Sequence, residues 1–281
     1  MTMTNRQTNA QRQPRAAEPT APLLREANGP LAILTLNRPA ARNALSEEMI
    51  AALHAEIDAT ATDNSVRAVV IAANGPSFSA GHDVKEMTAR RTDADGGRAY
   101  FHHIMTMCSN MMQAIVHCPK PVIAAVNGVA TAAGCQLVAT CDLAVAAKTA
   151  KFALPGVDIG LFCTTPMVAL TRNVPRKQAM EMLMTGEAIP AERARELGLV
   201  NRVVADGTEL AEAIALANLI ASKSMHTVKT GKAAFYRQAD MSLADAYRLA
   251  NEVMTANMMA RDAIEGLSAA IEKRKPRWED K

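Results

Sequence analysis

The sequence predicts an α/β fold with a largely parallel sheet. Residues 66–73 and 122–126 are almost wholly apolar runs, the pattern of strands that are covered on both faces. Segments with helical spacing of apolar residues follow these runs, so a strand, a turn and a helix recur along the chain. The chain has 281 residues and is 49% hydrophobic, which is enough to bury a sizeable core.

The first half begins with a predicted strand at residues 31–36, which Asn37-Arg38-Pro39 ends. Ser46 is a favourable N-cap for a helix, and acidic residues follow it in the first turn. Because the strand at 66–73 comes next, we expect a strand–helix–strand unit with parallel pairing. One face of the helix is formed by Met49, Ile50, Leu53 and Ile57.

The rest of the chain continues this alternation and then becomes helical. We divide it into a disordered tail at residues 1–25, a core at 26–205 and a C-terminal helical region at 206–281, whose apolar faces need a partner surface. Further strands are predicted at 122–126, 142–147 and 200–204, and helices at 100–117, 131–140, 166–174, 175–184, 190–197, 210–222, 228–237, 243–259 and 262–273.

The charge distribution argues against a nucleic-acid partner. The net charge is +3, and four arginines against Glu18 within residues 1–25 account for all of it. The remainder of the chain is therefore formally neutral, whereas a nucleic-acid face needs clustered positive charge. A local basic spot for a phosphate-bearing cofactor is still compatible with this balance.

Cysteine usage and the N-terminus bear on location. The five cysteines form no CxxC pair and no metal-ligand spacing, so we interpret them as reduced, partly buried thiols and expect no metal site in a cytoplasmic protein. No apolar run in the sequence is long and uninterrupted enough to span a membrane. Residues 1–22 lack the apolar segment of a secretory signal, and we favour a disordered tail over an organellar transit peptide.

Two strand–loop–helix stretches predict an oxyanion hole. The first is residues 78–87, and the second is residues 119–128 followed by residues 132–136. The first turn of a helix leaves backbone N–H groups without internal partners, and its partial positive charge suits an anion. Two such N–H groups that converge on one point would hold a negatively charged oxygen.

Several short motifs stand in a fixed order along the chain. They include Leu-Asn-Arg-Pro at 36–39, Arg-Asn-Ala-Leu at 42–45, Phe-Ser-Ala-Gly at 78–81, Asp-Val-Lys-Glu at 83–86 and Lys-Pro-Val-Ile-Ala-Ala-Val-Asn-Gly at 120–128, and continue with Gly134-Cys135, Cys141-Asp142, Thr185-Gly186, Ala194, Gly198-Leu199-Val200 and Lys273-Arg274-Lys275. In order and spacing the chain resembles the crotonase (enoyl-CoA hydratase/isomerase) superfamily over residues 28–278. The resemblance implies a ClpP-like spiral of repeated ββα units with C-terminal helices that form a homotrimer or a dimer of trimers.

The resemblance also implies an acyl-CoA thioester as ligand, with coenzyme A as part of the substrate and no prosthetic group. The thioester oxygen would accept hydrogen bonds from the backbone N–H groups of His82 and Ala133, and such preorganised donors are worth about 3 kcal/mol each. Arg42 and Lys85 would be either phosphate contacts or solvated charges, and Phe235 would pack either near the adenine or in the core. The positions of the CoA-binding loops are Arg42, Ala44, Ala80, Asp83, Val84 and Lys85.

The chain departs from the family pattern where the family's hydratases use two glutamates. Gln136 and Gly156 stand at those positions, and neither can transfer a proton near neutral pH, so we do not expect the two-glutamate route of hydration. Asp158 is either a replacement base or a surface carboxylate, and the ring of His82 is a candidate acid or base unless only its backbone matters. Cys163 has no evident base beside it, which argues against a nucleophile.

Three functions follow from this pattern. The leading one is a crotonase-fold enzyme that acts on a CoA thioester by hydration, isomerisation or thioester cleavage with non-standard groups. The second is a non-catalytic acyl-CoA binder or partner subunit, which the residues at 136 and 156 favour. The third is an oligomeric scaffold without a ligand.

Overall fold

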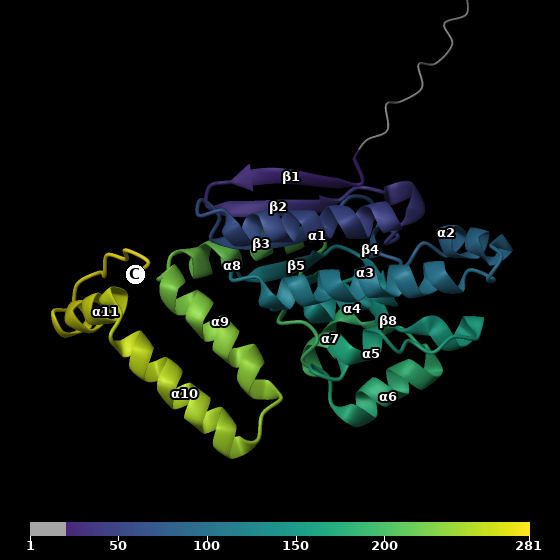
Figure 1. Cartoon of the computed structure of the whole chain (residues 1–281). Helices are drawn as coiled ribbons and strands as arrows, with labels where there is room; N and C mark the ends of the chain where they lie inside the picture. Colours follow the sequence, from purple (N-terminus) through teal and green to yellow (C-terminus); the bar gives the residue numbers. More distant parts are fainter. Residues whose placement is uncertain (1–20) are drawn as a thin grey trace, which may run out of the picture.

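Strands from successive turns of the chain form two sheets at the centre of the molecule. The computed structural model describes residues 21–281, so most of the predicted tail at 1–25 lies outside the described residues, while residues 23–25 belong to the first strand (Figure 1). The strands are β1 (Leu23–Asn28), β2 (Leu31–Leu36), β3 (Ala68–Ala73), β4 (Ser77–Ser79), β5 (Val122–Val126), β6 (Val129–Thr131), β7 (Leu143–Ala147), β8 (Lys151–Ala153), β9 (Ile189–Pro190) and β10 (Arg202–Val204).

The helices lie outside these sheets. Ser46 caps the first of them as predicted, since its Oγ accepts the N–H of Met49 at 3.3 Å. The helices are α1 (Glu47–Thr62), α2 (Val84–Ala89), α3 (Arg98–His117), α4 (Ala133–Thr140), α5 (Pro166–Leu170), α6 (Arg176–Thr185), α7 (Ala191–Glu196), α8 (Glu209–Ala221), α9 (Met225–Ala239), α10 (Leu243–Met258) and α11 (Arg261–Ile271).

The sheet order confirms the predicted spiral. The larger sheet runs β1-β2-β3-β5-β7-β10 and the smaller one β4-β6-β8-β9. The pairs β3–β4, β5–β6 and β7–β8 each give one strand to each sheet and lead into a helical segment, which is a ββα repeat. From β2 to β10 the larger sheet is parallel, so the expected strand–helix–strand unit around α1 is confirmed.

The edge strand β1 was not predicted. It pairs antiparallel with β2, and five of its six residues are exposed, so it has no apolar run to reveal it. The turn between the two strands did carry a signal, because it consists of Gly29-Pro30, and Gly29 takes the positive φ of 56° that the first position of a tight hairpin turn needs. β4, β6 and β8 have three residues each, which is too short for a periodicity argument.

The larger sheet is buried on both faces. Alternate residues of β3 point to opposite sides, so that Val69 and Ile71 join the core under α1 and α3 while Val70 and Ala72 face α8. On that second face Leu216 and its neighbours on α8 pack against β2, β3 and β5. α8 therefore covers the sheet, although it lies within the region assigned to the C-terminal helices.

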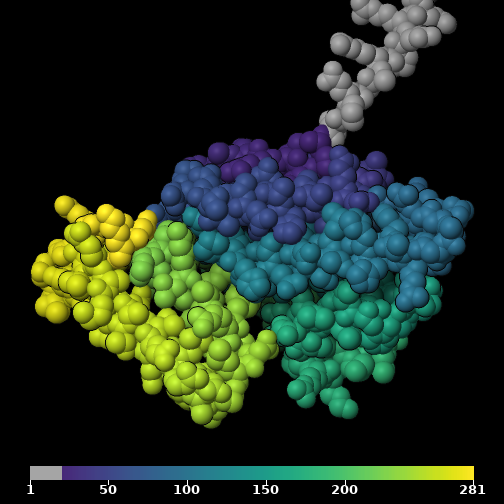
Figure 2. Space-filling view, in the orientation of Figure 1, coloured from purple at the N-terminus to yellow at the C-terminus, as the bar shows by residue number. Residues whose placement is uncertain are grey.

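Helices α9 to α11 stand beside this core. They form the lobe coloured light green to yellow in Figure 2, and a buried ion pair attaches it to the core, with Nζ of Lys232 at 2.7 Å from Oδ2 of Asp142. The same ammonium donates to the carbonyls of Ile115 and Lys120, and the hydroxyl of Tyr236 donates to Oδ1 of Asp142 at 2.8 Å. The side chain of Lys232 is only 8% exposed, so this cluster works in a largely dry environment.

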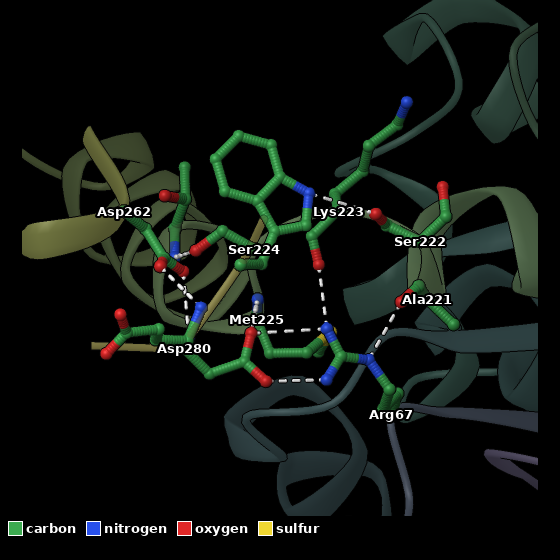
Figure 3. Close-up of polar contacts among 11 residues, drawn as sticks. Arg67, Ala221, Ser222, Lys223, Ser224, Met225, Asp262 and Asp280 are labelled. Carbon is green, nitrogen blue, oxygen red and sulfur yellow. Dashed lines mark hydrogen bonds and ion pairs between the residues drawn. The ribbon is translucent and has the colours of Figure 1, made fainter. Parts of the chain in front are cut away.

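The end of the chain makes a second attachment (Figure 3). The carboxylate of Asp280 accepts hydrogen bonds from the guanidinium of Arg67 and from the N–H of Met225. The carboxylate of Asp262, which is 2% exposed, accepts the N–H groups of Glu279 and Asp280. Together these bonds connect the C-terminal residues and α11 with the start of α9. They also attach this region to Arg67, the residue directly before β3.

We predict that Lys232→Met lowers the free energy of unfolding by about 3 kcal/mol, because it leaves the carboxylate of Asp142 buried without its cation. Urea unfolding followed by circular dichroism measures the change. Lys177→Met is the matched control, since Lys177 is exposed on α6 and makes no ion pair within residues 21–281. Equal losses for the two variants would contradict a stabilising role for the pair.

Candidate functional site

Two glycines allow the end of β4 and the start of α4 to touch. Gly81 has a φ of 85°, and a Cβ there would lie 2.9 Å from Cβ of Ala132 and 3.1 Å from N of Ala133. A Cβ on Gly134 would collide with the carbonyl oxygen of Ser79. Because neither position has room for a side chain, the two predicted loops meet along their backbones.

This contact brings the two predicted donors into one place. Leu45 bridges to His82 in parallel fashion, with its N–H donating to the carbonyl of Gly81 at 2.7 Å and its carbonyl accepting the N–H of Asp83. The N–H of His82 lies between these bonds and has no protein acceptor among residues 21–281. The N–H of Ala133, the first residue of α4, has no acceptor in that part of the chain either.

Buried polar groups hold the loop that carries His82. Oγ of Ser79, a fully buried residue, donates to the carbonyl of Asn43 at 2.9 Å. The amide of Asn43 in turn donates to the carbonyls of Asn74 and Ser77 at 2.9 and 2.8 Å. The N–H of His82 is thus presented by a loop whose own polar groups are satisfied, which is what a preorganised donor requires.

The predicted CoA-binding loops lie next to each other. The N–H of Ala80 donates to the carbonyl of Arg42 at 3.0 Å, which joins residues 42–44 to residues 80–85. The side chains of Arg42 and Lys85 are exposed and make no ion pair within the described chain, whereas Ala44 is buried and Val84 is 58% exposed. This rim presents two free cations beside an exposed apolar side chain.

Asp83 has a structural role within this rim. Its carboxylate caps α2 by accepting the N–H groups of Lys85 and Glu86, and it pairs with Arg38 at 3.1 Å. Partial burial acts to raise its pKa, but the hydrogen bonds from Glu86 and Arg38 outweigh this and hold the pKa of Asp83 below its usual value. Asp83 is therefore ionised near neutral pH, and its bonds to Arg38 and to the start of α2 hold the loop of residues 80–82 in place.

Phe235 is not brought to this rim in the single chain. It lies on α9, its side chain is 64% exposed, and its ring packs edge-on against Tyr236 with centroids 5.3 Å apart. α9 contacts the C-terminal end of α3 through Lys232, while α2 precedes the N-terminal end of α3. The core packing considered for Phe235 is therefore not seen, and its contact with the adenine stays a prediction.

The positions of the two family glutamates differ in their surroundings. Gln136 is 5% exposed on α4, and its Oε1 has no hydrogen-bond partner in the described chain. Gly156 is buried, and a Cβ there would lie 2.9 Å from both Sγ of Cys163 and the carbonyl oxygen of Leu161. The loop at 161–163 therefore occupies the space that a larger side chain at 156 would need.

Asp158 and Cys163 lie near this loop. Asp158 is exposed, and its Oδ2 lies 3.1 Å from where a Cβ on Gly186 would stand, at the end of α6. Burial raises the pKa of the Cys163 thiol, so it is not the thiolate that a nucleophile requires. All five cysteines are free and buried, and residues 21–281 contain no group of His, Cys, Asp or Glu side chains suited to a metal ion.

The sequence suggested the ring of His82 as a candidate acid or base but could not show its surroundings. Both of its nitrogens are buried and have no hydrogen-bond partner in the described residues. Burial lowers the pKa of this imidazole, opposed only by the backbone of Leu45, so the ring is neutral at physiological pH. The ring and the free N–H group thus belong to the same residue.

Comparison with known proteins places this geometry in a family. The family described as Enoyl-CoA hydratase/isomerase matches residues 26–281. Human "Enoyl-CoA hydratase domain-containing protein 3, mitochondrial" is 46% identical over 264 residues, which cover 94% of this chain and 85% of that protein. The "2,3-dehydroadipyl-CoA hydratase" of Escherichia coli is 35% identical and covers 87% of this chain and 93% of that protein.

Solved structures agree with the sequence relatives. A crystal structure of an enoyl-CoA hydratase from Mycobacterium smegmatis is 51% identical with a TM-score of 0.87, covering 92% of this chain and 98% of that one. The crystal structure of human enoyl-CoA hydratase domain-containing protein 3 is 44% identical with a TM-score of 0.86, covering 92% of this chain and all of that one. The chain therefore belongs to the enoyl-CoA hydratase/isomerase family and has the crotonase fold.

Proposed function

We propose that this protein binds an acyl-CoA thioester and stabilises negative charge on its carbonyl oxygen with the N–H groups of His82 and Ala133. The observation that carries the proposal is the close approach of the two loops that bear these free donors: a Cβ on Gly81, the residue before His82, would lie 3.1 Å from N of Ala133. Charge on a thioester oxygen grows in an enolate or a tetrahedral intermediate, and fixed donors act on both. Several relatives bear names of enoyl-CoA hydratases, which supports the substrate class.

The cationic rim supports coenzyme A as the part of the substrate that is held outside the hole. Arg42 and Lys85 are exposed and unpaired within the described chain, so they are available for phosphate groups. Val84, next to Lys85 in the chain, has 58% of its surface exposed, which suits an apolar part of the ligand. In this proposal the acyl group enters the protein and the nucleotide stays at the surface.

A second candidate is an acyl-CoA binder without catalysis. Gln136 cannot transfer a proton, and the loop at 161–163 leaves no room for a glutamate at 156. Restoring both glutamates would therefore disturb the loop, and Gln136→Glu alone is the cleaner variant. A wild-type protein that turns over a CoA thioester faster than this variant would count against the binder.

We propose that the protein self-associates through α9 to α11 as a homotrimer or a dimer of trimers. These helices carry large apolar side chains on their outer surface, as a subunit interface requires. The most exposed are Leu243 at 76%, Met259 at 77% and Ile271 at 82%.

We propose that the protein is located in the cytoplasm, and mitochondrial import is the alternative. Vertebrate relatives such as the human protein are named as mitochondrial. No helix within residues 21–281 is long and apolar enough to cross a membrane.

We predict that Gly81→Ala weakens binding of a CoA thioester about tenfold, because the new Cβ displaces Ala132 and Ala133 and removes one net hydrogen bond of about 1 to 1.5 kcal/mol. Isothermal titration with butyryl-CoA measures the affinity, and titration with coenzyme A itself, which has no carbonyl at the hole, should change little. The matched control is Gly96→Ala, since Gly96 also has a positive φ of 67° but open space at its Cβ. No binding of any acyl-CoA by the wild-type protein would overturn the proposed function.

We predict that Gly156→Ala lowers the free energy of unfolding by about 1 to 3 kcal/mol, since its Cβ would overlap Cys163 and the backbone of Leu161. Thermal and urea unfolding provide the measurement. Gly231→Ala, on α9 with nothing within 4 Å of its Cβ, should be neutral or stabilising. If Gly156→Ala is as stable as the wild type, Cys163 and Leu161 do not exclude a side chain at position 156.

We predict that Ile271→Lys dissociates the oligomer, because a charge replaces a side chain that is 82% exposed in the single chain and buried in the proposed interface. Light scattering after size exclusion gives the mass of wild type and variant. Met184→Lys on α6, 63% exposed, is the control that should leave the trimer intact. A wild-type protein that runs as a monomer would refute this proposal.

A further inference from the structure

The imidazole of His82 is unusual because both ring nitrogens are buried without a hydrogen-bond partner in the described residues. Buried polar side-chain atoms nearly always have a partner, and those that lack one need an explanation such as a catalytic role or a missing ligand or water. An imidazole always has at least one N–H and, when neutral, one free lone pair. Among the described residues only the backbone of Leu45 acts on the ring, and it favours the protonated form, so the neutral ring keeps a lone pair that can accept a proton from a bound molecule.

The residue that carries this ring gives that molecule an identity. The backbone N–H of the same residue is one of the two free donors, and the adjacent Gly81 contacts the start of α4 where the other donor, on Ala133, lies. Gln136 stands one turn further along α4, and helical side chains lean toward the N-terminus of their helix. Its Oε1 is also buried without a hydrogen-bond partner in the described residues, one turn from the donor of Ala133 along the same helix.

The electrostatics of the ring suit a base. Burial is the main cause that lowers the pKa of His82, and no charged side chain contributes to the shift. The neutral imidazole can accept a proton, whereas Gln136 cannot. Asp158, the other candidate base, is exposed at the end of α6 beside Gly186.

We propose that the neutral imidazole of His82 removes a proton from the α-carbon of the bound acyl-CoA. The substrate class is then a thioester with at least one hydrogen on that carbon. The C–H electron pair moves to form the C=C bond of an enolate, the carbonyl π pair moves onto oxygen, and the proton goes to a ring nitrogen. The N–H groups of His82 and Ala133 hold the charged oxygen, and return of a proton to carbon regenerates the thioester. The inference rests on the proposed function, because it needs the thioester oxygen at the two donors.

The test follows hydrogen exchange at the α-carbon. Wild-type protein is incubated with butyryl-CoA in D₂O, and mass spectrometry measures deuterium in the acyl group. We expect deuterium uptake with the wild type and a loss of about a hundredfold or more in its rate with His82→Gln, which keeps the backbone donor and removes the base. Isothermal titration of the same variant should give an unchanged affinity for butyryl-CoA.

Two further variants make the outcome specific. His102→Gln on α3, an exposed histidine, should exchange at the wild-type rate. His82→Ala should lose exchange and regain part of it when free imidazole is added, which a loss of folding would not allow. Wild-type exchange in His82→Gln, or binding without exchange in the wild type, would overturn the role of the ring. Absence of butyryl-CoA binding in the wild type would instead overturn the proposed function.

Discussion

The site depends on a backbone contact that leaves no room for side chains. Gly81 and Gly134 let the loop after β4 rest directly on the first turn of α4, which brings His82 and Ala133, the residues of the two free N–H groups, close together. The pairing of β4 with β6 and the buried bonds from Ser79 and Asn43 keep this contact in register. A larger residue at either glycine would push the two segments apart, because its Cβ would meet the opposite backbone.

Much of this arrangement was predictable because it is local. Consecutive residues determine the apolar strands β3 and β5, the N-cap at Ser46 and the small-residue loops before α2 and α4. The structure has these features where the sequence predicted them. The strands β4 and β6 were missed because three residues carry no periodicity, and β1 because an exposed edge strand has no apolar pattern. The motifs were enough to propose His82 and Ala133 as donors of the hole, since backbone groups do not depend on side-chain identity, and the role of these donors stays a prediction.

Other features depend on pairs of residues that are distant in the sequence. Nothing in the residues around Gly156 shows that Cys163 fills the space next to it, and nothing around His82 shows that its ring nitrogens lack partners. The bond between Arg67 and Asp280 joins residues more than two hundred positions apart. Such contacts are fixed by the packed structure, so a single sequence gives no signal for them.

The proposed hole consists of main-chain groups, and this has an evolutionary consequence. In the proposed function, replacements at residues 82 and 133 change the chemistry around the oxygen and keep its two donors, whereas replacements at the two glycines weaken the binding. A gene copy of this protein could therefore explore new reactions by single replacements while it still binds the thioester. The backbone donors and the side chains around them can therefore change independently, so selection can alter the chemistry without altering the proposed binding of the oxygen.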